Sequence, residues 1–172
     1  MKILKCLFLL LLIPFFGIGV KNNLKADKPE SNVDIVAKKL KNLSAVYYNH
    51  WKKSPNLSVG TVINGDPTSE NFDDSDWGTL DLEQRVSDDS CWLRKEIVLP
   101  ERILGQSVKG ELKLLLSVDD YGYLWINGKK KGYFPWDGDF VLTKHAQPGE
   151  KFLITIKVIN NGGPLRLLRA EL

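Results

Sequence analysis

Residue types that carry catalytic chemistry are scarce in this chain. The 172 residues include only two histidines, His50 and His145, so no cluster has the ligand spacing of a zinc site. No G-x-S-x-G nucleophile elbow is present. The glycine pair at 162–163 is followed by Pro164 and not by a helix, unlike a phosphate-binding loop. The sequence therefore offers no motif for zinc, serine-elbow or phosphate-loop chemistry.

The chain has one long apolar run, from Leu7 to Val20. It follows Lys2 and Lys5 and precedes the small residue Ala26, which is the layout of a secretory signal peptide. The run is shorter than the ~20 apolar residues that a membrane span needs. We expect residues 1–26 to be a signal peptide and the protein to be secreted or periplasmic. The alternative is an uncleaved N-terminal anchor.

Without that segment, the chain has no surplus of basic residues. The sequence holds 24 Lys and Arg against 21 Asp and Glu, and removal of the four lysines in residues 1–26 leaves 20 against 21. We therefore expect no nucleic-acid partner, and no membrane association after signal cleavage. Cys6 lies in the same segment, so Cys91 has no intrachain disulfide partner and is expected to be a small buried residue.

A helical pattern follows a polar spacer. Between Asn32 and Trp51, apolar residues recur at spacings of three and four. This stripe consists of Val36, Leu40, Leu43, Tyr47 and Trp51. Ser54-Pro55 is a suitable stop signal. We expect residues 27–56 to be an N-terminal extension with one amphipathic helix that docks its stripe on the domain or on a neighbouring one.

From Leu57 onward the apolar period changes to two, which is typical of strands. Residues 112–118 and 152–158 each place every second apolar side chain on one face. Between them, the Asn127-Gly128 pair predicts a hairpin with a type I′ turn. "WLRKEIVLP" and "GGPLRLLRAEL" are further strand candidates. We expect residues 57–172 to form one all-β domain, an antiparallel β-sandwich.

Aspartates occur in three adjacent pairs, at 73–74, 88–89 and 119–120. Neighbouring residues of a strand point to opposite faces, so one pair cannot supply the two facing carboxylates of a glycosidase. We expect each pair to mark a turn, because Asp side chains bond to nearby backbone N–H groups. Five acids crowd residues 66–76. A structural calcium in that loop is the alternative to a chain without cofactors.

Aromatic residues are the more telling candidates for binding. Tyr121, Tyr123 and Trp125 share one face of a predicted strand, whereas Leu124 and Ile126 share the other. If the aliphatic face packs on the core, the rings lie outside, where they can stack on sugars. The alternative is that the rings face inward or are covered by a partner domain.

The segment "GYFPWDGDF" is a second candidate. Trp136 stands between Pro135 and the sequence Asp137-Gly138-Asp139. We expect either the tip of a binding loop or a hydrophobic plug that closes the end of the sandwich.

Four motifs, in this order, resemble the sugar-binding domain of glycoside hydrolase family 2. They are "NFDDSDWGTLDL", "CWLRKEIVLP", "VDDYGYLWINGKKKG" and "PWDGDFVLTKHAQPGEKFLITIKVIN". The resemblance runs from Phe72 to Leu172 and implies a galactose-binding-like jelly-roll β-sandwich. The family's "LPHDW" is replaced by "LDLEQRV", and Lys151 stands at a position where the family has Asn. In the family this domain is non-catalytic and packs beside a catalytic barrel.

Together, these observations predict a non-catalytic carbohydrate-binding or accessory module associated with glycoside hydrolysis. It is either free-standing or the N-terminal part of a longer secreted glycosidase, so its expected partners are carbohydrate and a glycosidase catalytic domain. The binding candidates are Trp136, Tyr133, Asp137, Asp139, Tyr121 and Asp120. No catalytic or metal-binding residue is expected. The alternative is a structural or protein-interaction domain that docks through its aromatic face.

Overall fold

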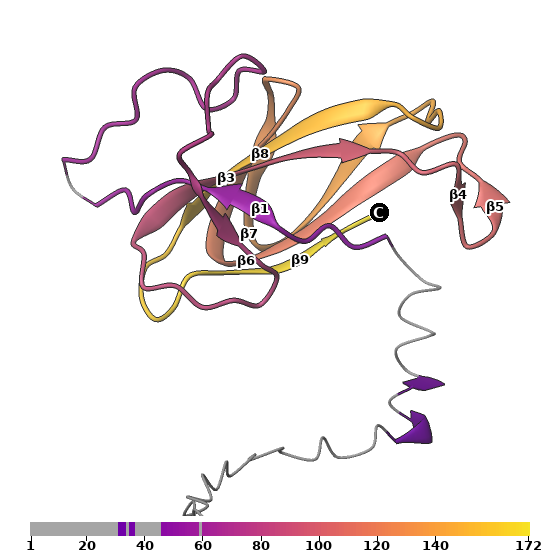
Figure 1. Cartoon of the computed structure of the whole chain (residues 1–172), viewed down its shortest axis with the longest axis horizontal. Helices are drawn as coiled ribbons and strands as arrows, with labels where there is room; N and C mark the ends of the chain where they lie inside the picture. Colours follow the sequence, from indigo (N-terminus) through magenta and orange to yellow (C-terminus); the bar gives the residue numbers. More distant parts are fainter. Residues whose placement is uncertain (1–30, 34, 37–45, 59) are drawn as a thin grey trace, which may run out of the picture. The chain divides into compact units, whose positions relative to one another are not determined.

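The computed structural model describes residues 31–33, 35–36, 46–58 and 60–172 of the chain (Figure 1). All named strands lie in the unit Asn32–Leu172. They are β1 (Trp51–Lys53), β2 (Gly78–Leu80), β3 (Ser90–Val98), β4 (Arg102–Ile103), β5 (Gln106–Ser107), β6 (Leu112–Ile126), β7 (Lys129–Thr143), β8 (Lys151–Ile159) and β9 (Arg166–Glu171). Each strand pairing is antiparallel, which confirms the expected all-β antiparallel class.

Seven of these strands form one curled sheet, in the order β2-β1-β3-β8-β6-β7, with β9 also paired to β6. Strand β6 changes partner along its length: residues 121–126 pair with β8, whereas residues 115–119 pair with β9. Its other edge pairs with β7, and that register shifts between Ser117 and Tyr121. The long β6–β7 hairpin therefore links two parts of the sheet, which curls around a single core (Figure 1).

The core is built by the residues that alternate in the sequence. From β6, Leu114, Leu116 and Leu124 are fully buried, and from β8, Ile154 and Ile156 are fully buried. Complete burial of one such side chain contributes about 1.5–3 kcal/mol. The two period-two segments that the sequence predicts are thus confirmed as core-facing strands.

The turn between β6 and β7 also has the predicted geometry. Asn127 and Gly128 have positive φ angles of 47° and 72°, as both central residues of a type I′ turn require. The Asn127 side-chain oxygen accepts a hydrogen bond from the Leu153 N–H at 2.7 Å, so the turn is tied to β8.

The predicted amphipathic helix is wrong at its C-terminal end. Trp51 is fully buried in strand β1, which pairs with β2 and β3, so it lies in the core of the sheet and not on a helical stripe. Tyr47 forms a bridge with Glu171, the last residue of β9. The sheet therefore begins at Trp51, before the predicted domain boundary at Leu57. Asn32, Val33, Ile35 and Val36 are helical, whereas Leu40 and Leu43 lie outside the described residues.

The predicted signal peptide, residues 1–26, also lies outside the described residues. Among the residues that are described, no helix is long and apolar enough to span a membrane.

Candidate functional site

The two faces of β6 differ in the way that one of the sequence interpretations requires. Leu124 and Ile126 are buried in the core. Tyr121, Tyr123 and Trp125 are half-buried, on the opposite face of the strand. The alternative in which these rings form the core is therefore wrong, and the rings lie on the outer face of the sheet.

Five rings from three strands form a continuous series on this face, which we call the aromatic row. Neighbouring ring centroids lie 5.2 Å apart for Trp92–Trp125, 6.4 Å for Trp125–Tyr123, 5.3 Å for Tyr123–Tyr133 and 5.8 Å for Tyr133–Tyr121. The last pair is stacked, with an interplanar angle of 24°. These distances are typical of interacting aromatic pairs.

Strand register explains why the row forms. Trp92 of β3 lies opposite Lys157 of β8, which lies opposite Tyr123 of β6, which lies opposite Tyr133 of β7. Residues that face each other across antiparallel strands share one side of the sheet. Trp92 and Tyr133 are far apart in the sequence, and the pairing of four strands places them in the same row.

Two lysines accompany the aromatic row. Lys130 Nζ lies 4.9 Å from the Tyr123 ring centroid and 5.7 Å from that of Trp125. Lys157 Nζ lies 5.7 Å from the Trp92 ring centroid. These are cation–π distances. In the described part of the chain, neither lysine has an ion pair with a carboxylate, so the row carries uncompensated positive charge.

Tyr133 is the most open ring of the row, with 49% of its surface exposed. Desolvation, together with the neighbouring phenols Tyr121 and Tyr123, raises its pKa. The Tyr133 hydroxyl is therefore neutral at pH 7 and can both donate and accept a hydrogen bond.

The three aspartates expected at the site already have partners. The Asp120 carboxylate accepts a hydrogen bond from the Asn161 N–H at 2.7 Å. Asp137 lies 3.2 Å from an Arg169 guanidinium nitrogen, and Asp139 lies 3.1 Å from Lys113 Nζ. Each acid thus connects two segments of the fold, and its carboxylate is less available to a ligand than the sequence suggests.

Trp136 lies in a strand and not at a loop tip. The segment expected to be a loop belongs to β7, where Pro135 lies opposite Tyr121 and Asp137 lies opposite Ser117. Trp136 itself has a positive φ of 55°, at the point where the β6–β7 register shifts. Its side chain is 51% exposed, so the expectation of a buried plug is wrong. Tyr133 and Tyr121 are the two predicted site residues that the structure brings into direct contact.

A surface depression of about 380 Å³ adjoins the Trp92 end of the aromatic row. It is lined by Leu57 and by residues from the segment 61–67, together with residues of β3 and β8. The lining consists of Leu57, Thr61, Val62, Ile63, Gly65, Pro67, Ser90, Trp92 and Lys157. The sequence interpretation did not identify Trp92 and Lys157. The sequence does carry a signal for Trp92, because it alternates with the core residues Cys91 and Leu93 and therefore points to the outer face.

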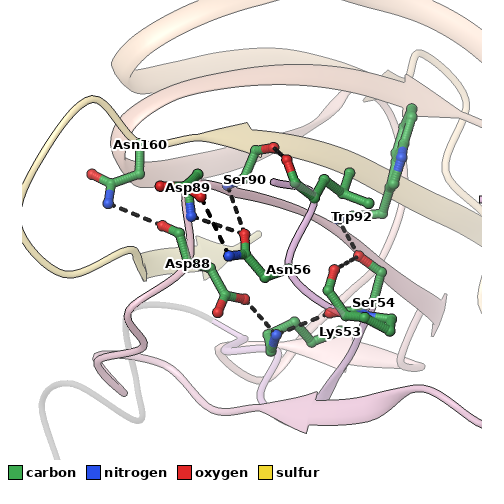
Figure 2. Close-up of polar contacts among 10 residues, drawn as sticks. Lys53, Ser54, Asn56, Asp88, Asp89, Ser90, Trp92 and Asn160 are labelled. Atoms are coloured by element: carbon green, nitrogen blue, oxygen red, sulfur yellow. Dashed lines mark hydrogen bonds and ion pairs between the residues drawn. The ribbon is translucent and has the colours of Figure 1, made fainter. Parts of the chain in front are cut away.

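The backbone around Trp92 is fixed by a polar network, which Figure 2 shows. Ser54 Oγ accepts a hydrogen bond from the Trp92 N–H at 2.9 Å. Asn56 Oδ1 accepts one from the Asp89 N–H at 2.9 Å, and Lys53 Nζ lies 2.5 Å from an Asp88 oxygen. These contacts hold the segment before β3 against the segment that follows β1. The second segment includes Leu57, which lines the depression.

A buried arginine holds the adjacent loop onto the sheet. Arg94 is 4% exposed, and its guanidinium donates hydrogen bonds to the carbonyl of Ser69 at 2.8 Å, to the carbonyl of Phe72 at 3.3 Å and to the Asp74 carboxylate. It also lies 5.2 Å from the Phe72 ring centroid. The hydrogen bond from Arg94 thus engages Asp74, one of the five acids for which a calcium site was considered.

Two more of those acids are used within the loop. Asp66 Oδ1 accepts hydrogen bonds from the Thr68 N–H at 2.9 Å and the Thr68 hydroxyl at 2.8 Å, which lower the Asp66 pKa. Hydrogen bonds from Ser75 likewise lower the Asp73 pKa. Over the described ranges, no group of three or more His, Cys, Asp or Glu side chains is placed to hold a metal ion.

Cys91 is buried in the core, as the sequence predicts. Burial raises the pKa of its thiol to about 12. The reactive thiolate is therefore almost absent at pH 7, and this side chain acts as a small core residue.

The fold and the site together define an antiparallel β-domain that presents an aromatic row, flanked by lysines, on its outer face. No protein-family model matches the sequence, and no curated protein sequence matches it. Solved structures do match it, and several of them are glycosidases.

One match is Bacteroides uniformis beta-glucuronidase, with a TM-score of 0.55 at 17% identity, over 74% of this chain and 17% of that chain. A glycosyl hydrolase family 2 member from Bacteroides cellulosilyticus matches with a TM-score of 0.51 at 15% identity, over 74% of this chain and 20% of that chain. A beta-glucuronidase from an uncultured Clostridium sp. matches with a TM-score of 0.51 at 16% identity, over 68% of this chain and 22% of that chain.

The structural resemblance to glycoside hydrolase family 2 that the sequence predicts is therefore confirmed at the level of fold. The chain spans about a fifth of the length of these enzymes. What it shares with them is the fold of one portion.

Proposed function

We propose that this protein is a non-catalytic carbohydrate-binding or accessory module associated with glycoside hydrolysis. Its domain is a galactose-binding-like jelly-roll sandwich, and its N-terminal segment directs export. The observation that carries the proposal is the aromatic row on the outer face of the sheet. The fold shared with part of several glycosidases supports it.

Sugar binding through this row has a simple physical basis. The apolar faces of pyranose rings stack on aromatic rings, while their hydroxyls need polar groups nearby. The Tyr133–Tyr121 pair offers both, because Tyr133 is half-exposed and carries a neutral hydroxyl. Trp136 provides a further exposed ring on the same strand as Tyr133. These three side chains are the proposed contacts, with Asp120, Asp137 and Asp139 as polar groups at the edges.

A second candidate function is favoured by the position of the lysines. Lys130 lies over Tyr123 and Trp125, and Lys157 lies over Trp92, so part of the row is already covered by the chain's own cations. Such a face is also suited to packing against another polypeptide. The partner for this role is a glycosidase catalytic domain.

Calorimetric titration of the purified chain with a panel of neutral and charged oligosaccharides separates the two candidates. We expect binding that Tyr133→Ala weakens five- to tenfold, equivalent to about 1–1.4 kcal/mol, and that Trp136→Ala also weakens. Leu104→Ala is the control, because Leu104 is a 56% exposed apolar residue in the β4–β5 turn. If a folded sample binds no glycan at millimolar concentration, the sugar-binding proposal is wrong and protein docking remains.

A further inference from the structure

We propose that the depression beside Trp92 is a subsite for an acidic saccharide, with a sugar ring stacked on Trp92 and its carboxylate or sulfate bound by Lys157. This inference rests on the proposed function, and it names a ligand class and a position that the aromatic row alone does not.

The shape of the depression suits one or two sugar rings. Its volume of about 380 Å³ falls within the range of about 300–1,000 Å³ that is usual for small-molecule sites. Leu57, Val62 and Ile63 supply an apolar wall, and Ser90 supplies a polar group. An aromatic side chain, an apolar wall and a few polar groups are the components of a saccharide site.

The charge of the depression decides between neutral and acidic ligands. Lys157 is the single ionisable residue in the lining, so the site carries one positive charge at pH 7. The nearest acids in sequence, Asp66 and Asp89, are not part of the lining, and hydrogen bonds hold their carboxylates to Thr68 and Asn56. An anionic group close to the ammonium is attracted by it, and this attraction is stronger near a protein surface than in bulk water.

The present position of Lys157 over Trp92 does not prevent this role. A cation–π contact at an exposed site is weak. A hydrogen bond between two oppositely charged groups is stronger. The lysine stem is flexible, so an anionic sugar that enters the depression can draw the ammonium away from the indole and free the ring face for stacking.

The indole, in contrast, is held in place before the ligand arrives. The Ser54 hydroxyl accepts a hydrogen bond from the backbone N–H of Trp92, and the Asn56, Asp88 and Asp89 contacts fix the segment that leads into β3 (Figure 2). The indole itself packs against the Trp125 ring, with centroids 5.2 Å apart. A fixed ring with a movable cation beside it lowers the ordering cost of binding.

A matched pair of ligands tests the inference: an oligogalacturonate and the neutral galacto-oligosaccharide of the same length, titrated calorimetrically into the purified chain. We expect the acidic ligand to bind about tenfold more tightly. Lys157→Gln should remove that preference without changing affinity for the neutral ligand, whereas Lys157→Arg should keep it. Trp92→Leu should weaken the binding of both ligands. A sulfated oligosaccharide of the same length shows whether carboxylate or sulfate is preferred.

Lys109→Gln is the control for general electrostatic attraction, since Lys109 is exposed and precedes β6 at the end remote from Trp125. If Lys109→Gln and Lys157→Gln reduce the preference equally, the subsite is wrong. Equal affinity for both ligands in the wild type also overturns it and leaves the proposed function intact. No binding of either ligand overturns the subsite, and the wider oligosaccharide panel then decides the sugar-binding proposal separately. NMR chemical shifts of the backbone amides, recorded during the titration, locate the ligand. If the shifts are confined to residues near Tyr133 and Trp136, the ligand binds elsewhere and the subsite is wrong. Circular dichroism confirms that each variant is folded.

Discussion

The two faces of β6 belong to the same strand, but they differ in their exposure to water and in the residues that they contact. On the inner face, Leu124 and Ile126 are almost fully removed from water. On the outer face, Tyr123 and Trp125 are half-buried and contact other rings and lysines. The inner face stabilises the fold by burial, whereas the outer face keeps its apolar surface partly available. The difference indicates that the strand uses one face to build the core and leaves the other partly exposed to solvent.

The largest expected effect comes from truncating each face in turn. Leu124→Ala should lower the free energy of unfolding by about 2–5 kcal/mol, because it leaves a cavity in the core. Tyr123→Ala should cost less, about 0.5–1.5 kcal/mol for its ring pairs, since its surface is already partly hydrated. Urea denaturation followed by tryptophan fluorescence measures both. Equal losses would show that the outer row is also part of the core.

A second contrast concerns two arginine–aspartate pairs. Asp119 is 6% exposed and accepts hydrogen bonds from Arg166 at 2.7 and 2.9 Å, whereas the Asp137–Arg169 pair is exposed. Asp119→Ala should lower stability by about 1.5–3 kcal/mol, because it leaves a charged partner without hydrogen bonds. Asp137→Ala should lower it by less than about 1 kcal/mol. Thermal unfolding of both variants checks this order, and a larger loss for Asp137→Ala would contradict it.

The smallest effect is a dependence on pH in the loop beside Arg94. Hydrogen bonds from Thr68 hold the pKa of Asp66 below its usual value of 3.8, so its stabilising contribution is present above pH 3.8 and is lost as the pH falls through the lowered folded-state pKa. The stability difference between wild type and Asp66→Ala should therefore be constant near neutrality and shrink in acid. Urea titrations between about pH 2 and pH 6 measure it. A difference that stays constant to the lowest pH would exclude this carboxylate contribution.

The features that the sequence predicted correctly depend on local patterns. Alternation places Leu114, Leu116 and Ile156 inside, and Asn127-Gly128 fixes the hairpin because few other pairs tolerate two positive φ angles. The aliphatic side of β6 is recognisable as the core side for the same reason. Such signals are complete within a few residues, so a single sequence is enough to identify them.

The features that the sequence did not predict depend on residues that are distant in the chain. Trp51 fits a helical stripe by spacing, yet it is placed in a strand by pairing with Leu80, and that strand also pairs with Leu93 and Arg94. The segment around Trp136 has the Pro, Gly and Asp of a loop, yet β6 draws it into a strand. Trp92 joins the aromatic row only through the β3–β8–β6 register. In each case the deciding contact is remote in sequence.

The pairing of the first and last described segments of the domain has a consequence for its connections. The Tyr48 N–H donates to the Ala170 carbonyl at 2.9 Å, and the Leu172 N–H donates to the Val46 carbonyl at 3.1 Å. A polypeptide joined before Val46 and one joined after Leu172 would therefore leave the domain from the same place. A short linker could also connect these two positions, with new ends opened in the exposed β4–β5 turn, to give a circularly permuted domain that keeps every strand of the sheet.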